Sequence, residues 1–209
     1  MARESPPLDD GIARVEVLSL LAVALRPPTD RESLRECLAR LRERLGPLAS
    51  AESLEALERL ESHPGPEREY HRLFLGPSRP IAPPFESVYR ERQAYGASTL
   101  EFVRELRDAG LEPVGSFRLP PDHLALQLEY LAFLEDHILE AGARGGAAAE
   151  SFWMDSARAF RDKHLALWLP PFLSRLEGGA AESPYTCLVR LVVDVLGIPH
   201  AQAERKEGD

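Results

Sequence analysis

Polar side chains that could bind a ligand follow a proline-rich connector within residues 69–89, EYHRLFLGPSRPIAPPFESVY. Glu86, Ser87 and Tyr89 come directly after the last prolines of this connector. Pro80, together with the pair at 83–84, restricts the backbone before the loop orders, which lowers the entropy cost of holding the loop rigid. A stiff loop between two helix ends is costly unless something must be held there. We therefore expect the connector to form part of a binding site.

A short helix is predicted immediately before the connector. Tyr70, Leu73 and Phe74 fall at positions i, i+3 and i+4, so their side chains can line one face. Gly76 and Pro77 should end this helix, because glycine accepts the left-handed C-terminal conformation and proline cannot continue the turn.

A second group of polar side chains lies on a long helix predicted over residues 121–141, PDHLALQLEYLAFLEDHILEA. Two apolar stripes along this segment indicate that most of the helix is buried. Asp122, Glu129 and Asp136 are spaced by seven residues, so they recur at nearly the same angle. These carboxylates could bind a cationic ligand. The alternative is that they form the solvent-exposed strip of a core helix.

His123 lies at the positive end of the predicted helix, which favours the neutral imidazole. A neutral ring both donates and accepts, so it can bridge a loop to a side chain. Asp122, His123 and Ser87 could imitate a hydrolase triad. However, adjacent residues on a helix point about 100° apart, and the sequence has no nucleophile elbow. We therefore expect a structural or binding histidine and no catalytic residue.

Metal-binding and redox spacings are absent from the sequence. Its six histidines form no HExxH motif and no pair at i, i+4. Cys37 and Cys187 lie far apart with no CxxC motif, and each sits among Leu and Val in a helical pattern. We expect two free buried thiols, no metal site and no cofactor.

Charge and composition exclude several classes of function. The formal net charge of -9 argues against nucleic-acid binding, which needs a basic surface. No apolar stretch approaches the roughly 18 residues of a membrane span. The N-terminal residues MARESPPLDD carry no apolar export signal. Together these observations predict a cytoplasmic protein without membrane insertion.

Helical periodicity dominates the chain, and no alternating strand pattern is convincing. The predicted fold class is all-α, with about nine helices in a single globular domain over residues 1–200 and a disordered tail at 201–209. The glycines between Gly142 and Gly146 interrupt the pattern most strongly, and we expect a hinge there.

Local signals predict where several helices begin. Thr29 followed by Glu32, and Ser98 followed by Glu101, each form a capping box. Pro121 suits the first turn of the long helix, where its missing N–H costs nothing.

Three sequence blocks resemble the TorD/DmsD/NarJ family of cytoplasmic chaperones in their order and spacing. They are the connector block at 69–89, the segment from Pro121-Asp122-His123-Leu124 to Glu129, and a looser block at 164–172 containing Trp168. The resemblance spans roughly residues 12–197. It implies an all-α protein that binds the N-terminal leader of a molybdenum oxidoreductase catalytic subunit, often a twin-arginine signal, until the cofactor is inserted. Two positions depart from the pattern: Gln127 replaces a commonly acidic residue, and Leu131 a common methionine.

A leader has an arginine-containing region followed by an apolar segment, so its recognition needs apolar walls and a few polar groups at one end. The resemblance and the residue types together suggest how the candidate residues divide. The side chains that could form apolar walls are Tyr70, Phe74, Pro83, Pro84, Tyr89 and Trp168. Glu86, Asp122 and Glu129 could accept the guanidinium groups of the leader. Ser87 and His123 could form hydrogen bonds to the backbone of the leader. For each aromatic side chain, packing in the core is the alternative.

The predicted partner is therefore the leader, or the N-terminus of a non-exported subunit, of a molybdopterin oxidoreductase. We expect a monomer or a dimer that exchanges helices at Gly142–Gly146. Two alternatives stay open. One is a protein that binds guanine nucleotide or molybdenum cofactor, for which the sequence holds no nucleotide motif. The other is a small hydrolase that uses His123 and Ser87. The peptide-binding hypothesis requires that the connector and the start of the long helix meet in space to form a cleft.

Overall fold

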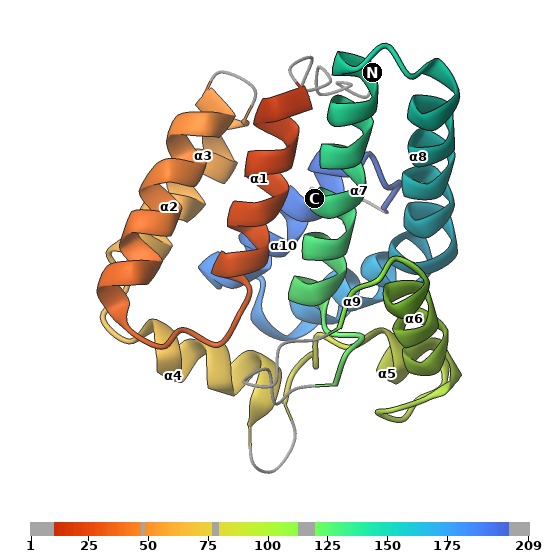
Figure 1. Ribbon diagram of the computed structural model, residues 1–209. Helices are drawn as coiled ribbons and strands as arrows, with labels where there is room; N and C mark the ends of the chain where they lie inside the picture. The colour runs from red at the N-terminus through yellow and green to blue at the C-terminus, as the bar shows by residue number, and fades with distance from the viewer. Residues whose placement is uncertain (1–10, 47–48, 77–79, 113–119, 201–209) are drawn as a thin grey trace, which may run out of the picture.

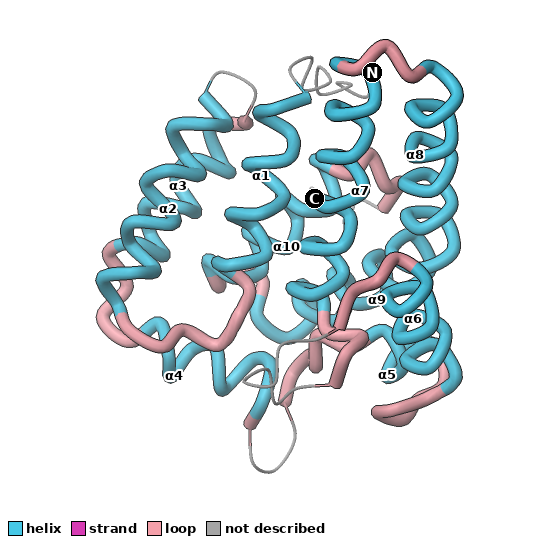
Figure 2. Tube along the Cα trace, viewed as in Figure 1, coloured by secondary structure: helices cyan, strands magenta, loops and turns pink. Residues whose placement is uncertain are grey.

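A computed structural model describes residues 11–46, 49–76, 80–112 and 120–200. These ranges contain nine continuous helical segments and no strand (Figures 1 and 2). The elements are α1 Gly11–Ala24, α2 Arg31–Leu45, α3 Ala51–Glu61, α4 Pro66–Tyr70 with the π-helical turn η2 His71–Leu75, α5 Glu86–Arg90, α6 Ala97–Asp108, α7 Leu124–Ala143, α8 Ala147–Phe160 with the π-helical turn η3 Arg161–Leu165 and α9 Ala166–Ala180, and α10 Pro184–Val195. The prediction of a single all-α domain is confirmed. The predicted tail at 201–209 lies outside the described residues.

The long helix α7 lies in the middle of the fold. It packs against α1 on one side and against α8 on the other, and α1 packs in turn on α2 (Figure 1). Helix α10 packs against α3 and α9. Leu124, Leu128, Leu131 and Leu134 of α7 are all at most 1% exposed, as the apolar stripes predict.

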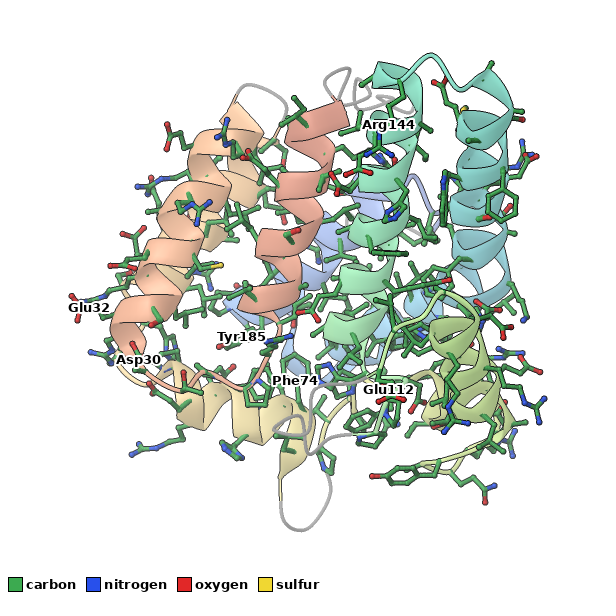
Figure 3. All side chains as sticks on the ribbon, in the orientation of Figure 1. Asp30, Glu32, Phe74, Glu112, Arg144 and Tyr185 are labelled. Carbon is green, nitrogen blue, oxygen red and sulfur yellow. The ribbon has the colours of Figure 1, made fainter. Side chains whose placement is uncertain are left out.

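Two predicted capping boxes are wrong. Asp30 is the N-cap of α2, where its carboxylate accepts the backbone N–H of Ser33 at 2.7 Å (Figure 3). Thr29 lies one residue before the cap. Ser98 lies inside α6, which begins at Ala97, and its hydroxyl donates to Glu91 instead of capping the helix. Both motifs contain suitable residue types, but the helices begin one residue after Asp30 and one residue after Gly96, so these residues are the caps.

Helix α7 begins at Leu124, three residues later than predicted. His123 is its N-cap, and its ring Nδ1 accepts the backbone N–H of Ala125 at 3.0 Å. The backbone at 122–124 is instead used to pair with the proline connector, because Asp122 O accepts from Glu86 N at 3.2 Å and Leu124 N donates to Pro84 O at 3.0 Å. A tertiary contact therefore shortens the helix that Pro121 was predicted to begin.

Helices α7 and α8 are joined by a short turn in which Gly145 has a φ of +69°, a conformation that favours glycine. Within the described ranges, none of the helices combines the length and apolarity needed to cross a membrane. The hinge predicted at Gly142–Gly146 stays a prediction.

Candidate functional site

The proline connector and the start of α7 meet in space. Glu86 N donates to the carbonyl oxygen of Asp122 at 3.2 Å, and Phe85 and His123 form an isolated antiparallel bridge. The structure thus brings together the two segments that the binding hypothesis requires. The contact between them is closed, however. Glu86, Ser87, Asp122 and His123 are all 0% exposed.

Asp122 holds the first turn of α5 in place. Its Oδ2 accepts the backbone N–H of Ser87 at 2.8 Å, which satisfies a donor that the short helix leaves free. The carboxylate also lies where the partial positive charge of the helix start favours an anion. The other oxygen, Oδ1, and the hydroxyl of Ser87 are buried without a hydrogen-bond partner among the described residues. Asp122 is thus a cap for a neighbouring segment and not a first-turn residue of its own helix.

His123 is the middle of a buried hydrogen-bond relay. Since its Nδ1 accepts from Ala125, the ring proton is assigned to Nε2, which donates to the hydroxyl of Tyr70 at 3.2 Å. Tyr70 then donates to the carbonyl oxygen of Leu25 at 2.9 Å. Burial, assisted by the charge of Arg26, lowers the pKa of His123 to about 3, so the ring is neutral. Both ring nitrogens are engaged, which leaves none to accept the proton of Ser87 in a hydrolase.

Glu86 is the centre of a second buried network. His164 lies in the turn η3, and its Nδ1 is 2.8 Å from Glu86 Oε2. The carboxylate also accepts the side-chain amide of Gln127 and the guanidinium of Arg90. Glu86 was predicted to receive a guanidinium from a ligand. In the structure it receives one from its own helix, four residues further on.

The side-chain contacts of Gln127 explain why an amide replaces the acidic residue that is common in the family. Its Nε2 donates to Glu86, while its Oε1 accepts the indole N–H of Trp168 at 2.9 Å. An ionised carboxylate at this position could accept from the indole but could not donate to Glu86. The amide is therefore the side chain that satisfies both neighbours. Sequence reasoning treated Gln127 as a lost carboxylate and missed this role.

His164 and Glu105 were also missed as members of the site. His164 Nε2 is 3.2 Å from Glu105 Oε1, and Lys163 Nζ donates to the same oxygen at 2.6 Å. Burial by itself lowers the pKa of His164, but hydrogen bonds to Glu105 and Glu86 outweigh it and raise the pKa to about 9. His164 therefore carries a positive charge at neutral pH. Its place in the third sequence block was a signal for it, whereas Glu105 has no local motif.

The candidate wall residues are mostly in the core. Tyr70, Phe74 and Trp168 are at most 1% exposed, and Pro84 is also buried. Phe74 packs against Tyr185 with ring centroids 5.7 Å apart, near the lower end of α7 (Figure 3). These aromatic side chains therefore pack in the core, as the alternative to a role in the binding walls predicted.

Three candidates reach the surface. Pro83 and Tyr89 are half-buried in the connector region, and the ring of Tyr89 stacks on Trp168 at 5.6 Å. The side chain of Glu129 is 38% exposed and forms an ion pair with Arg26. Burial raises the pKa of Glu129, and the neighbouring Arg26 opposes that shift.

Two clefts open elsewhere on the described surface. One, of about 620 Å³, lies between the C-terminal end of α3, the α4–η2 segment and the α9–α10 turn. The other, of about 290 Å³, lies between α6, α7 and α8. Neither is lined by any of the eleven candidate residues. No group of three or more histidine, cysteine, aspartate or glutamate side chains in the described ranges is arranged to hold a metal ion.

Comparison with known proteins gives consistent results. Residues 27–174 match the family model described as nitrate reductase delta subunit. The chain is 30% identical over 178 residues to the chaperone protein TorD of Vibrio cholerae, covering 79% of this chain and 80% of that protein. It is 49% identical over 67 residues to the selenate reductase assembly chaperone protein of Thauera selenatis, covering 31% and 32% of the two chains. A crystal structure of a proposed redox enzyme maturation protein from Archaeoglobus fulgidus superimposes with a TM-score of 0.60 at 20% identity, over 88% of this chain and 93% of that one, which shows a shared fold.

Proposed function

Because this chain belongs to the nitrate reductase delta subunit family, we propose that it is a non-enzymatic chaperone for the assembly of a molybdenum-cofactor oxidoreductase. It acts in the cytoplasm, where it binds the N-terminal leader of the catalytic subunit, of the twin-arginine type or its non-exported equivalent. The chaperone holds that subunit until the cofactor is inserted, before export or assembly.

The observation that carries this proposal is the convergence of the three sequence blocks on one buried junction. Asp122 and Ser87 join there across 35 positions of the chain, and His164 and Glu86 join across 78 positions. The relatives that share this chain's sequence over most of their length are named as chaperones. The blocks therefore build a shared scaffold, and the leader contacts the surface that this scaffold supports.

The side chains that reach that surface are the proposed contact residues. Pro83 and Tyr89 supply apolar area for the leader, and Glu129 receives a guanidinium. Since Glu129 already pairs with Arg26, an arginine of the leader would replace an internal one. Glu129 has one ion pair before the leader binds and one after it binds. The net change in free energy from this exchange is therefore small, and the complex can dissociate. The buried candidates hold these three in position.

Calorimetric titration with a synthetic leader, taken from a molybdenum oxidoreductase encoded beside this gene, tests the proposal. We expect saturable binding with a Kd in the micromolar range or slightly tighter, about −8 kcal/mol or below. Glu129→Gln should weaken binding by up to about fivefold, as expected for loss of a half-exposed ion pair of about 1 kcal/mol or less. Glu140→Gln is the matched control, because Glu140 lies on the same helix and also pairs with an arginine, Arg144.

Alanine variants of Asp122 or His123 are poor tests of binding, because both side chains are fully buried. Their removal would disturb the junction and lose binding through loss of structure. Absence of heat with every leader, together with tight binding of GTP, would overturn the proposal in favour of a nucleotide-binding protein.

A further inference from the structure

The cleft between α6, α7 and α8 has an aromatic floor. Tyr130 and Phe160 meet edge to face with ring centroids 4.8 Å apart, and Trp153 and Leu134 complete the apolar lining. Phe152 lines the entrance and is 62% exposed. Single exposed apolar side chains are common on protein surfaces. Here, however, the exposed ring adjoins a cleft whose floor is aromatic, which is typical of a binding site.

One wall of the cleft is acidic. Glu105 and Asp108 line it from α6. Glu105 is paired with Lys163, whereas the carboxylate of Asp108 has no hydrogen-bond or ion-pair partner among the other described residues. Burial, together with the charges of these two carboxylates, raises the pKa of Tyr130 to about 12. The tyrosine on the floor therefore lies in a negative electrostatic potential.

We infer that this cleft binds a polypeptide segment in which a cationic side chain lies next to a large apolar one. The aromatic floor and Phe152 receive the apolar side chain. Asp108 pairs with the cation, which also lies against the face of Tyr130. The inference deepens the proposed function and rests on it, because it assigns the cleft to a basic and apolar segment of the client protein.

The size and charge of the cleft favour this occupant over a nucleotide or cofactor. A volume of about 290 Å³ lies just below the range for small-molecule sites, which is about 300–1,000 Å³. It therefore suits one or two side chains. Lys163 is the one cationic side chain among the lining residues, and it is already paired with Glu105. A phosphate group would meet mainly carboxylates there.

The cleft shares an ionic network with the connector junction. Glu105 on the cleft wall contacts His164, and His164 contacts Glu86 at the start of α5. A cation of the client that reaches Glu105 would compete with Lys163 for the same oxygen. Two consecutive polar contacts, Glu105–His164 and His164–Glu86, thus join the cleft wall to the connector junction.

A blocked dipeptide tests the cleft without a client protein. N-acetyl-phenylalanyl-arginine amide is titrated into the full chain, and the indole N–H signal of Trp153 is followed by NMR. N-acetyl-phenylalanyl-citrulline amide has nearly the same shape without the charge. We expect the arginine probe to shift the Trp153 signal and to bind about fivefold tighter than the citrulline probe.

Variants of the cleft complete the test. Phe152→Ser and Asp108→Asn should each weaken binding of the arginine probe by about fivefold or more, as for an interface anchor. Met154→Ser and Asp155→Asn are matched controls, because both residues are exposed on α8 and neither lines the cleft. All four side chains lie on the surface, so folding should be preserved. Equal binding of the two probes, or no effect of Phe152→Ser and Asp108→Asn, overturns the inference.

Titration of the leader separates this inference from the proposed function. If the leader binds and Phe152→Ser and Asp108→Asn leave its affinity unchanged, the cleft does not take that segment and the inference fails, while the proposed function stands. If no leader binds but the arginine probe still occupies the cleft, the proposed function fails instead.

Discussion

His164 and Glu86 lie 78 positions apart in the chain, yet His164 Nδ1 and Glu86 Oε2 are 2.8 Å apart and both side chains are fully buried. A buried charge is tolerated only when its partner and its remaining hydrogen bonds are all present. Glu86 meets this condition through Gln127 and Arg90, and His164 meets it through Glu105. The pair thus ties the connector to the π-helical turn that precedes α9.

Stability should decrease at alkaline pH because of His164. Its pKa is about 9 in the folded protein, against 6.5 for the unperturbed group. The folded state therefore binds the proton more tightly than the unfolded state does. The stabilisation is complete below about pH 6.5, declines as the pH rises, and is lost as the pH passes through about 9. Urea denaturation at several pH values between these limits measures the decline.

Histidine variants assign this pH dependence. His164→Gln should remove most of the decline, although it also lowers stability at neutral pH by about 3 kcal/mol or more, the usual cost of removing one member of a buried ion pair. His137→Gln, on α7, should leave the decline in place. An unchanged slope in His164→Gln would contradict the assignment, as would an imidazole pKa near 6.5 measured by NMR.

Replacing Gln127 by glutamate should destabilise the junction. The new carboxylate would lie beside that of Glu86, and it could not donate the hydrogen bond that the amide now provides. We expect a loss of about 1–3 kcal/mol at neutral pH from the unsatisfied group, with repulsion adding to it. Close carboxylates raise the pKa of one of them, so the loss should shrink as the pH falls towards about 5.

Gln93→Glu is the matched control for this substitution, because Gln93 is exposed and the change of charge is the same. Chemical denaturation of the two variants at pH 7 and pH 5 measures the difference. Equal stabilities at neutral pH would show that the amide of Gln127 has no special role.

Removing the hydroxyl of Tyr70 should be costly. In Tyr70→Phe, His123 Nε2 loses its acceptor and Leu25 O loses its donor, both in the core. We expect a loss of about 1–3 kcal/mol in the free energy of unfolding. Tyr185→Phe is the comparison: its ring lies 5.6 Å from that of Tyr70, but its hydroxyl is buried without a partner among the described residues.

Tyr185→Phe should therefore be neutral or slightly stabilising, since the variant removes a buried polar group that lacks a hydrogen bond. Thermal or urea unfolding of the two variants gives the contrast directly. A larger loss in Tyr185→Phe than in Tyr70→Phe would contradict the relay described for His123.

Both thiols should be unreactive in the native protein. Burial raises the pKa of Cys37 to about 11 and also raises that of Cys187, so little reactive thiolate is present near neutral pH. Iodoacetamide at pH 7.5 should label neither thiol quickly in the native state and both in guanidinium chloride. Cys37→Ser identifies which thiol is labelled, and rapid labelling of native Cys37 would contradict its burial.

The fold was predictable because its signals are local. Apolar residues at helical spacing fixed the class as all-α, and the prolines with Gly76 marked the connector. The helix starts were less predictable, since Thr29 and Asp30 are both good caps, and the structure shows that Asp30 accepts the backbone N–H of Ser33. Helix α7 does not begin at Pro121, because the backbone of Asp122 and Leu124 is hydrogen-bonded to the connector.

From residue types and their spacing alone, the helical class, the stiff connector and the three blocks of the family were determined, because periodicity and turn chemistry depend on neighbours along the chain. The tertiary structure decided which of those residues are buried and what each one contacts. The sequence shows that Glu86 is acidic, but only the structure shows that its hydrogen-bond partners come from α5, α7 and η3. The hydrogen-bond partners of a buried polar group come from segments that are distant in sequence, and tertiary packing determines which of these segments lie next to it.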